Sequence, residues 1–356
     1  MEGPIGPESS INMLYGMPLR IGPILMGEGA VRIGSTFRSS GLAPAKAILI
    51  GEHFVVSGAT AIAIAIDLYA KANASLAPRG SISISAQGLG IRGEGARASR
   101  ASGAEEGPFG PLISMVRAFL DRYGIDRGVD IRLSSAIPIS AGLGSSAAIA
   151  VSVLAALSGL FGMELRREEM FDLAFISERI LHGSPSGIDH ATSIYGGAIA
   201  YSPPKGFRRL SVAKEISLVV GDTLKRRSTR DQVLKVQSFL KRDGRVAREI
   251  FDRIRGISEG AISCLEGGDM EGLGELMNEN QALLSEVGAS SEELDRLIGA
   301  SLEAGAFGAK LTGAGGGGCM IALGPPEALD AIANSIKGAG GAPYRVRMDS
   351  AGYRVG

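Results

Sequence analysis

The most informative part of this 356-residue chain is the segment Pro138-Ile-Ser-Ala-Gly-Leu-Gly-Ser-Ser-Ala-Ala148. Its two glycines and two serines lead directly into an alanine-rich apolar pattern, which predicts a helix from about Ser145 to Leu160. Glycines let backbone N–H groups approach a ligand closely, and a helix N-terminus adds free donors and the positive end of a dipole. The segment therefore predicts a phosphate-binding loop, with a plain turn capped by Ser145 or Ser146 as the alternative.

The same segment matches the GxGxxA pattern of dinucleotide-binding proteins, and Gly313-Ala-Gly-Gly-Gly-Gly318 is a second match. Such folds need a strand directly before the glycines and an acidic residue about 20 positions later, at the end of the next strand. Here Pro138 separates the predicted strand from the loop, and Glu164 begins a helical pattern. NAD binding is therefore disfavoured, and a Walker A loop is excluded because the sequence contains no GxxxxGKS/T.

Two carboxylates follow each other closely after this helix. Glu178 lies in the last turn of a helix predicted for Glu168–Leu181, and Asp189 follows in a predicted loop rich in Gly, Ser and Pro. A carboxylate on a helix end and another on a nearby loop can divide metal binding and proton abstraction between them. Solvated acids beside a capped helix end are the alternative.

A lysine and a cationic segment add positive charge to this picture. Lys46 opens a buried strand predicted for Ala47–Ile50, and because desolvating its charge is costly we expect a carboxylate or phosphate nearby. The alternative is an ammonium group that reaches solvent. Asp222–Thr229 carries three consecutive cations followed directly by two hydroxyl residues, so it either contacts an anionic substrate or is a solvated surface loop.

Composition excludes several classes of protein. The 37 Lys+Arg balance 37 Asp+Glu, which argues against a basic footprint for nucleic acid and against binding to an anionic membrane. Two cysteines cannot form a disulfide framework or a zinc site, a usage typical of the cytoplasm, and no apolar run is long enough to span a membrane. The 52 glycines, about twice the usual share, predict many tight turns and close backbone approaches.

The rest of the pattern alternates strands and helices, and the composition shifts around residues 205–216, where we place a domain boundary. Strands are predicted at Ala61–Ala70, Ala72–Ala77, Ile82–Ala86, Val129–Leu133, Ala198–Tyr201, Ser217–Gly221, Ala309–Leu311, Met320–Leu323 and Tyr344–Met348. Further helices are predicted at Pro111–Tyr123, within residues 230–305 and at Ala328–Ala339, whereas Gly88–Gly110 is predicted to be loop.

Taken together, these segments resemble the GHMP kinases, the family of galactokinases and of homoserine, mevalonate and phosphomevalonate kinases. Lys46–His53 is similar to the family's substrate-side strand, Pro138–Ala148 to its phosphate-cradling motif, and Lys310–Cys319 to its third, glycine-rich motif. The motifs occur in the family's order and cover the chain from about residue 42 onward. Gly51–Gly58 and His182–Asp189 are similar to signatures of the branch that phosphorylates mevalonate.

The resemblance implies an α+β fold of two domains with the active site in the cleft between them. The N-terminal domain is expected to be a ribosomal-protein-like βαβ domain at residues 42–210, and the C-terminal domain a ferredoxin-like α/β sandwich at residues 211–356. Residues 1–41 would be an extension. The implied activity is ATP- and Mg²⁺-dependent transfer of the γ-phosphate to the C5 hydroxyl of (R)-mevalonate, in isoprenoid biosynthesis. A cytoplasmic homodimer is expected, with no nucleic-acid or membrane partner.

The resemblance also assigns roles to individual residues. Asp189 corresponds to the catalytic base and Lys46 to the lysine beside it, while Ser146 and Glu178 correspond to the Mg²⁺ ligands. The ATP-binding residues are expected to be Pro138, Ile139, Ser140, Ala141, Gly142, Leu143, Gly144, Ser145, Ser146, Ala147 and Ala148. The substrate-binding residues are expected to be Glu52, His53, Asp189, Thr229 and Gly315.

Three positions depart from the family pattern, and one of them, His190, leaves the fine choice of substrate open. Ala45 stands where Gly is usual, Ser57 where Tyr is common, and His190, beside the expected base, where Asn is usual. A related kinase acting on phosphomevalonate or another small alcohol is the nearest alternative. A non-catalytic, ligand-sensing member of the family is disfavoured because Lys46 and both carboxylates are present.

Overall fold

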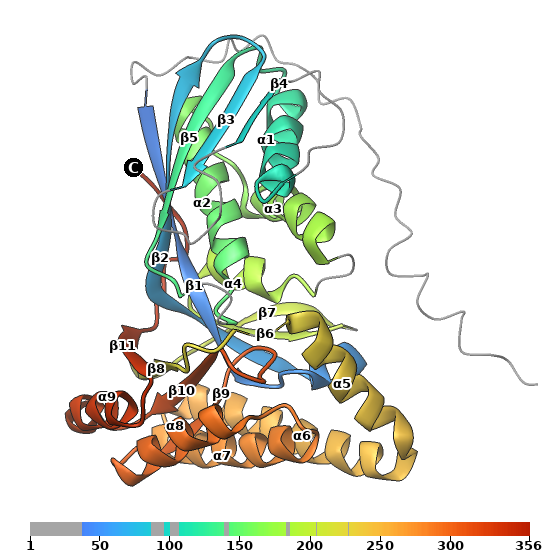
Figure 1. Ribbon diagram of the computed structural model, residues 1–356, viewed down its shortest axis with the longest axis vertical. Helices are drawn as coiled ribbons and strands as arrows, with labels where there is room; N and C mark the ends of the chain where they lie inside the picture. Colours follow the sequence, from blue (N-terminus) through green and yellow to red (C-terminus); the bar gives the residue numbers. More distant parts are fainter. Residues whose placement is uncertain are drawn as a thin grey trace, which may run out of the picture. The chain divides into compact units, whose positions relative to one another are not determined.

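The computed structural model of the protein describes residues 38–86, 96–99, 107–138, 142–182, 186–203, 205–226 and 228–356. The chain divides into two compact units, Met1–Arg32 and Ile33–Gly356, and every described residue belongs to the second. The described residues form an α+β fold with two lobes (Figure 1). The first lobe is a sheet of eight described strands with helices α1–α4, and the second lobe is a four-stranded sheet with helices α5–α9.

Two long strands, β1 and β2, form the centre of the first lobe and pair antiparallel. The strands of this sheet are β1 (Arg38–Ile50), β2 (Ala61–Ala77), β3 (Ser81–Ala86), β4 (Ala96–Ser99), β5 (Gly128–Ser135), β6 (Ala198–Ser202), β7 (Gly206–Leu210) and β12 (Arg354–Val355). β2 was predicted as two strands separated at Lys71, but it is continuous because Lys71 is an outward-facing residue between the buried Ala70 and Ala72. β1 begins at Arg38, so the last four residues assigned to the N-terminal extension belong to the sheet.

The βαβ unit expected for this lobe consists of β3, α1 and β5. β3 and β5 are parallel neighbours, the only parallel pair among the described strands, and α1 lies between them in the chain. The short strand β4 falls inside the stretch predicted as loop, and its side chains are outside the described residues. β7 also lies where a linker was expected, because a five-residue strand with three exposed positions has no recognisable apolar pattern.

Helices α1–α4 complete the first lobe, and α2 packs on β1 and β2. Their bounds are α1 (Gly110–Arg122), α2 (Ser145–Leu160), α3 (Arg167–His182) and α4 (Ile188–Tyr195), and a 3₁₀ turn (Phe54–Ser57) follows β1. The prediction that Asp189 lies in a loop is wrong, because Asp189 is the second residue of α4. α4 has only eight residues between Gly187 and Gly196, too few for a helical period to stand out.

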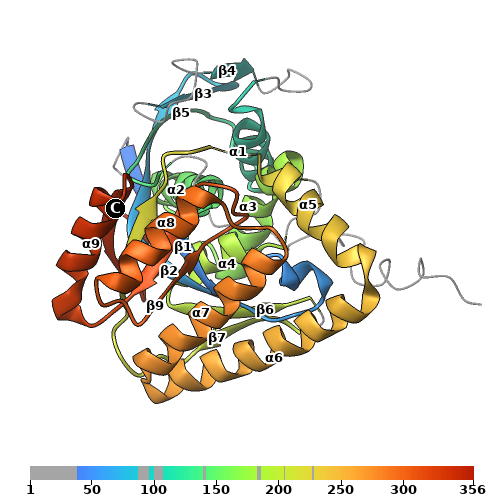
Figure 2. The ribbon, with the colours of Figure 1, turned by 60° about the horizontal axis from the view of Figure 1, so that its bottom comes forward.

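The second lobe has the βαββαβ order of a ferredoxin-like fold, with antiparallel strands in the order β11-β8-β10-β9. Its strands are β8 (Ser217–Asp222), β9 (Gly308–Leu311), β10 (Cys319–Leu323) and β11 (Ala342–Arg347). Its helices are α5 (Thr229–Arg242), α6 (Gly244–Gly267), α7 (Met270–Glu286), α8 (Glu292–Glu303) and α9 (Leu329–Gly338), with a 3₁₀ turn at Pro326–Ala328. α7, α8 and α9 pack against this sheet (Figures 1 and 2).

Three features join the two lobes. One continuous cluster of buried apolar side chains runs from β1 and β2 into β8, β9 and β10. The chain also returns after β11 to the first lobe, where β12 pairs with β1. Finally, the turn after β1 is hydrogen-bonded to β9 and α7.

No helix in the described part of the chain has both the length and the apolar content needed to cross a membrane.

Candidate active site

Lys46 and Asp189 form an ion pair, with Nζ of Lys46 3.2 Å from Oδ1 of Asp189. Lys46 lies in β1 and is only 4% exposed, whereas the side chain of Asp189, in the first turn of α4, is 29% exposed. The carboxylate that we predicted beside this buried lysine is therefore present. The pair combines a buried positive charge with a carboxylate that remains accessible to a small molecule.

Glu178 adds a second carboxylate to this pair. It lies in α3, is 7% exposed and accepts a hydrogen bond from the hydroxyl of Ser146. Burial, together with the negative charge of Asp189, raises the pKa of Glu178 from 4.5 to about 7, although Lys46 and Ser146 act in the opposite direction. The structure thus brings together the four residues expected to hold the metal and move the proton.

The donors around Glu178 fit a magnesium ion. A carboxylate and a hydroxyl are hard oxygen ligands, and Mg²⁺ is usually bound through few protein groups, with phosphate oxygens and water completing its coordination. Among the described residues no group of three or more His, Cys, Asp and Glu side chains is placed to hold a metal. Ser146 and Glu178 are the residues that would hold the ion, together with phosphate oxygens and water.

The predicted phosphate loop begins beside this pair. Ile139, Ser140 and Ala141 lie outside the described residues, whereas Pro138 is buried and Gly142–Ala148 leads into α2. Within the described part of the loop no side chain caps the N-terminus of α2, so the alternative of a serine-capped turn is not what the structure shows. Its first backbone N–H groups and the helix dipole are suited to an anion.

Gly144 lets the phosphate loop approach the ion pair. Its φ is +69°, and a Cβ atom added there would lie 2.9 Å from Cγ of Lys46 and 3.5 Å from Oδ2 of Asp189. The N–H of Lys46 also donates to the carbonyl of Leu143 at 3.0 Å. The start of α2 and the Lys46–Asp189 pair are therefore directly adjacent.

Glu52 lies deeper than its expected role in substrate binding suggests. Its carboxylate is buried and forms an ion pair through Oε1 with Nζ of Lys310, which is fully buried in β9. Nζ of Lys310 also donates to the carbonyls of Leu311 at 2.7 Å and Ile48 at 3.4 Å. The other oxygen of Glu52, Oε2, is buried and has no hydrogen-bond partner among the described residues.

His53 connects the turn after β1 to the third glycine motif. Its Nε2 donates to the carbonyl of Ala314 at 2.9 Å, and burial lowers the pKa of the ring. Its φ of +62° is unusual for a residue with a side chain, so the contacts around it must hold the backbone in this conformation. The same turn is held by the N–H of Gly51, which donates to Oδ1 of Asn280 at 3.0 Å.

The third glycine motif also touches the phosphate loop. A Cβ on Gly142 would lie 2.8 Å from the carbonyl oxygen of Thr312, and one on Gly313 would lie 2.8 Å from Cα of Gly142. Gly315 packs against the loop between α7 and α8, because a Cβ there would collide with the carbonyl of Ala289 at 2.1 Å. Close backbone packing thus explains why residue 315 is glycine. The expected contact between Gly315 and substrate stays a prediction.

Thr229 is an exposed residue at the first position of α5. Its neighbour one turn on, Gln232, donates through Nε2 to the carbonyls of Gly288 and Ala289 and lies against Gly316. α5 is therefore adjacent to the third glycine motif. Among the described residues no hydrogen bond or ion pair joins Thr229 to Lys46 or Asp189, and its role in binding substrate also stays a prediction.

Sequence reasoning missed the roles of Lys310 and Thr312. Oγ1 of Thr312 accepts a hydrogen bond from the N–H of Ile48 at 2.8 Å, beside the Lys310–Glu52 pair. A charged side chain inside an apolar strand, the pattern that selected Lys46, also occurs at Lys310 between Ala309 and Leu311. That signal predicts a buried carboxylate partner, but it does not identify Glu52 as the partner.

Two family models match the chain, one over a region that contains Pro138–Ala148 and one over a region that contains Lys310–Cys319. The family model for the GHMP kinases N terminal domain matches residues 111–197, and the model for the GHMP kinases C terminal region matches residues 261–342.

Individual relatives and solved structures give the same result. The mevalonate kinase of Thermococcus sibiricus is 40% identical to this chain, and the match covers 88% of the chain and 97% of that protein. The crystal structure of Methanococcus jannaschii mevalonate kinase has a TM-score of 0.77 at 30% identity and covers 88% of this chain and 99% of its own. That of L. major mevalonate kinase in complex with R-mevalonate has a TM-score of 0.76 at 30% identity, with 87% and 96% covered.

Proposed function

Because this chain belongs to the GHMP kinase family and is 40% identical to a protein named mevalonate kinase, we propose that it transfers the γ-phosphate of ATP to the C5 hydroxyl of (R)-mevalonate. The observation that carries the proposal is the Lys46–Asp189 ion pair placed against the N-terminus of α2. This arrangement puts a proton acceptor, a cation and an anion-binding helix end in one place. Phosphoryl transfer depends on such positioning and charge neutralisation.

Asp189 is the base in this proposal. Its partly exposed carboxylate accepts the proton of the C5 hydroxyl while that oxygen forms a bond to the γ-phosphorus, and the bond to the β-phosphate oxygen breaks to release ADP. Lys46 keeps a positive charge 3.2 Å from this carboxylate and stabilises the negative charge that develops on the attacking oxygen. The cation is effective because it is buried, where water screens it little.

The nucleotide is bound by the backbone of the phosphate loop and the uncapped start of α2. Ser146 and Glu178 are the residues that would hold Mg²⁺, which when bound neutralises phosphate charge. We place mevalonate between Asp189 and the turn that carries Glu52 and His53, where the two lobes meet. We further propose a cytoplasmic enzyme and a homodimer, the latter testable by light scattering.

The base assignment is tested with Asp189→Asn, which keeps the size of the side chain and removes its basicity. We expect kcat with mevalonate and MgATP, measured by coupled ADP release, to fall roughly 100- to 10,000-fold. Asp172→Asn is the matched control, since Asp172 is an exposed carboxylate on α3, and it should change kcat less than about twofold. Turnover of Asp189→Asn within a few-fold of the parent would contradict the assignment.

The acceptor is tested separately. We expect kcat/KM for (R)-mevalonate to exceed that for phosphomevalonate and other small alcohols by at least about 100-fold, because positioning of the hydroxyl beside Asp189 limits the rate. A higher value for phosphomevalonate would show that the chain is a related GHMP kinase. The result would leave the role of Asp189 intact, so the two parts of the proposal can fail independently.

A further inference from the structure

Three backbone segments close a ring of hydrogen bonds behind the candidate site. The N–H of Ala65 donates to the carbonyl of Gly197 at 2.9 Å, the N–H of Gly197 to the carbonyl of Asp349 at 2.7 Å, and the N–H of Asp349 to the carbonyl of Ala65 at 2.9 Å. Ala65 belongs to β2, Gly197 follows α4, and Asp349 lies in the segment after β11. The C-terminal segment thereby joins two elements that are distant in sequence.

Each of the two residues bonded to Asp349 in this ring lies close to one residue of the Lys46–Asp189 ion pair, either across the sheet or along the chain. Ala65 is the residue opposite Lys46 in the β1–β2 ladder. Gly197 is two residues beyond the end of α4, the helix whose first turn carries Asp189. Because α4 spans only eight residues, a shift of its C-terminal end moves its N-terminal end as well.

The ladder is irregular at this point. Pro44 pairs with Tyr69 but the next residue, Ala45, pairs with Ile66, so β2 bulges by two extra residues beside Lys46. A bulge re-aims the side chains next to it and has to be held by other contacts. Asp349 contacts β2 on both sides of the bulge, through its backbone to Ala65 and through its side chain to Tyr69.

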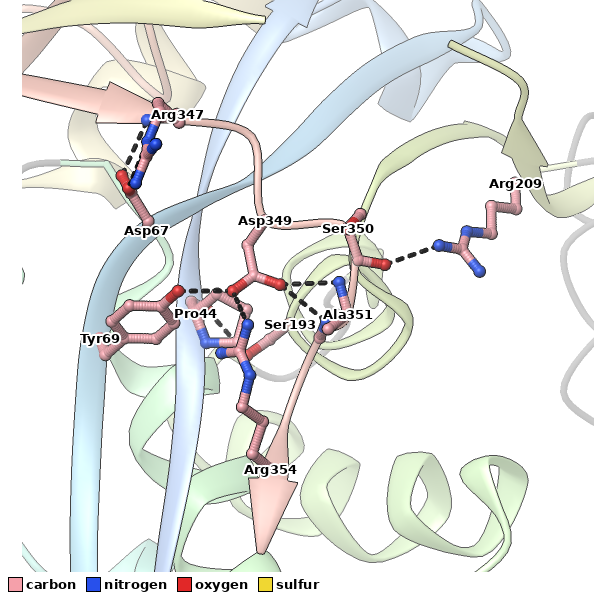
Figure 3. Close-up of polar contacts among 11 residues, drawn as sticks. Pro44, Asp67, Tyr69, Ser193, Arg209, Arg347, Asp349, Ser350, Ala351 and Arg354 are labelled. Atoms are coloured by element: carbon pink, nitrogen blue, oxygen red, sulfur yellow. Dashed lines mark hydrogen bonds and ion pairs between the residues drawn. The ribbon is translucent and has the colours of Figure 1, made fainter. Parts of the chain in front are cut away.

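The carboxylate of Asp349 is built into this junction, as Figure 3 shows. Its side chain is 1% exposed. Oδ2 accepts hydrogen bonds from Oη of Tyr69 at 2.6 Å and from Nη2 of Arg354 at 2.8 Å. Oδ1 accepts hydrogen bonds from the backbone N–H groups of Ala351 at 2.8 Å and Gly352 at 2.9 Å. Burial opposes ionisation, but these hydrogen bonds outweigh it and lower the pKa of Asp349. The carboxylate therefore stays charged, and its hydrogen bonds to the N–H groups of Ala351 and Gly352 stabilise a turn at residues 349–352.

That turn packs directly on the end of α4. A Cβ on Gly196 would lie 2.3 Å from the backbone nitrogen of Gly352, and one on Gly352 would lie 2.3 Å from the carbonyl oxygen of Ile194. α4 is also tied to β1, since Oγ of Ser193 donates to the carbonyl of Pro44 at 2.8 Å, next to the bulge. No side chain fits between the turn and the helix, so the position of one sets the position of the other.

We propose that Asp349 is a positioning residue that holds the β2 bulge and α4 in the arrangement in which Lys46 meets Asp189. This inference rests on the proposed function, because it gives the Lys46–Asp189 pair its catalytic role. The C-terminal segment thereby has a part in phosphoryl transfer, although it lies outside the three family motifs.

The test is a double-mutant cycle between Asp349 and Asp189. In the parent, Asp349→Ala should lower kcat about tenfold while KM for ATP changes less than about twofold, because the phosphate loop is not part of the ring. In the Asp189→Asn background the same change should lower the residual kcat less than about twofold, since the geometry it protects no longer matters. Asp349→Asn, which can still accept from Ala351 and Gly352, should recover part of the loss.

Two further variants keep the result interpretable. Asp269→Ala removes the carboxylate that caps α7, away from the ring, and should leave kcat within about twofold of the parent. Tyr69→Phe removes one hydrogen bond to Asp349 and should give a smaller loss of kcat with the same dependence on Asp189 if Asp349→Ala does not fold. Equal losses in both backgrounds, or an unchanged kcat for Asp349→Ala and Tyr69→Phe, would overturn the proposal. Full activity of Asp189→Asn alone would instead overturn the proposed function.

Discussion

Glu178 shows how the candidate site is organised at the scale of one residue. Burial and the charge of Asp189 raise its pKa from 4.5 to about 7, so the folded protein binds a proton that the unfolded chain has released between these two pH values. The free energy of unfolding therefore falls as pH rises from 4.5 to 7. It stays reduced above pH 7, because the buried Glu178 carboxylate is then ionised in the folded protein.

The first prediction follows from this loss of stability as pH rises. In metal-free buffer, Glu178→Gln should be more stable than the parent by about 1–3 kcal/mol at pH 8, and the two should be similar near pH 4.5. Thermal unfolding of both proteins at the two pH values measures the difference. A stabilisation that is the same at both pH values, or a less stable variant at pH 8, would contradict the prediction. The variant should also lose activity, since a carboxylate that destabilises the fold is retained for binding.

At the same scale, the sequence predicted that Lys46 has an anionic partner but not the contacts that support the pair. Lys46 could be selected because a buried lysine needs a carboxylate, and that carboxylate is Asp189. Asp349 could not be selected, since an aspartate near a chain end is usually solvated and its partners Ala65 and Gly197 are far away in sequence. Only the folded arrangement identifies it.

At the scale of elements, the helices with a long apolar period were predicted closely. α2 begins and ends where the sequence predicted, at Ser145 and Leu160, because its start is marked by glycines and its length covers several turns. α4, β7 and β12 were missed because they are short, and tertiary contacts rather than their own pattern stabilise them. The missed helix is the one that carries Asp189.

The contact between β9 and the turn after β1 gives a prediction about stability. Lys310→Met leaves Glu52 ionisable and buried without its partner, so it should lower the free energy of unfolding by about 3–5 kcal/mol. Adding Glu52→Gln to Lys310→Met should recover a large part of this loss, because no charge then remains buried there. Urea denaturation of the parent, the single variant and the double variant measures both effects.

A surface ion pair of the same lobe is the control for that experiment. Arg345 and Asp330 pair on the exposed side of β11 and α9, where water screens their charges. Arg345→Met should therefore change the free energy of unfolding by less than about 1 kcal/mol. A loss for Lys310→Met as small as that of the control, or no recovery in the double variant, would show that the buried pair does not hold β9 to the turn.

At the scale of the whole molecule, the two lobes are interlocked rather than merely adjacent. One cluster of buried apolar side chains includes residues of β1 and β2 together with residues of β8, β9 and β10. The Lys310–Glu52 pair lies on one side of this junction, and the C-terminal segment returns to the first lobe around Asp349. Unfolding one lobe would therefore expose apolar surface of the other, at a cost of about 25 cal/mol for each Å².

The last prediction is that both lobes unfold in a single cooperative transition, although chains of this length often unfold through intermediates. Calorimetry should give one thermal transition with a calorimetric enthalpy close to the van't Hoff enthalpy, and probes of secondary and tertiary structure should change together. Asp349→Ala and Lys310→Met should each move this transition to lower temperature without dividing it, because the shared apolar cluster remains in both variants. A separate, earlier transition of the second lobe in the parent would show that the apolar cluster does not couple the lobes, and the positions of Lys46 and Asp189 would then have to be set within the first lobe alone.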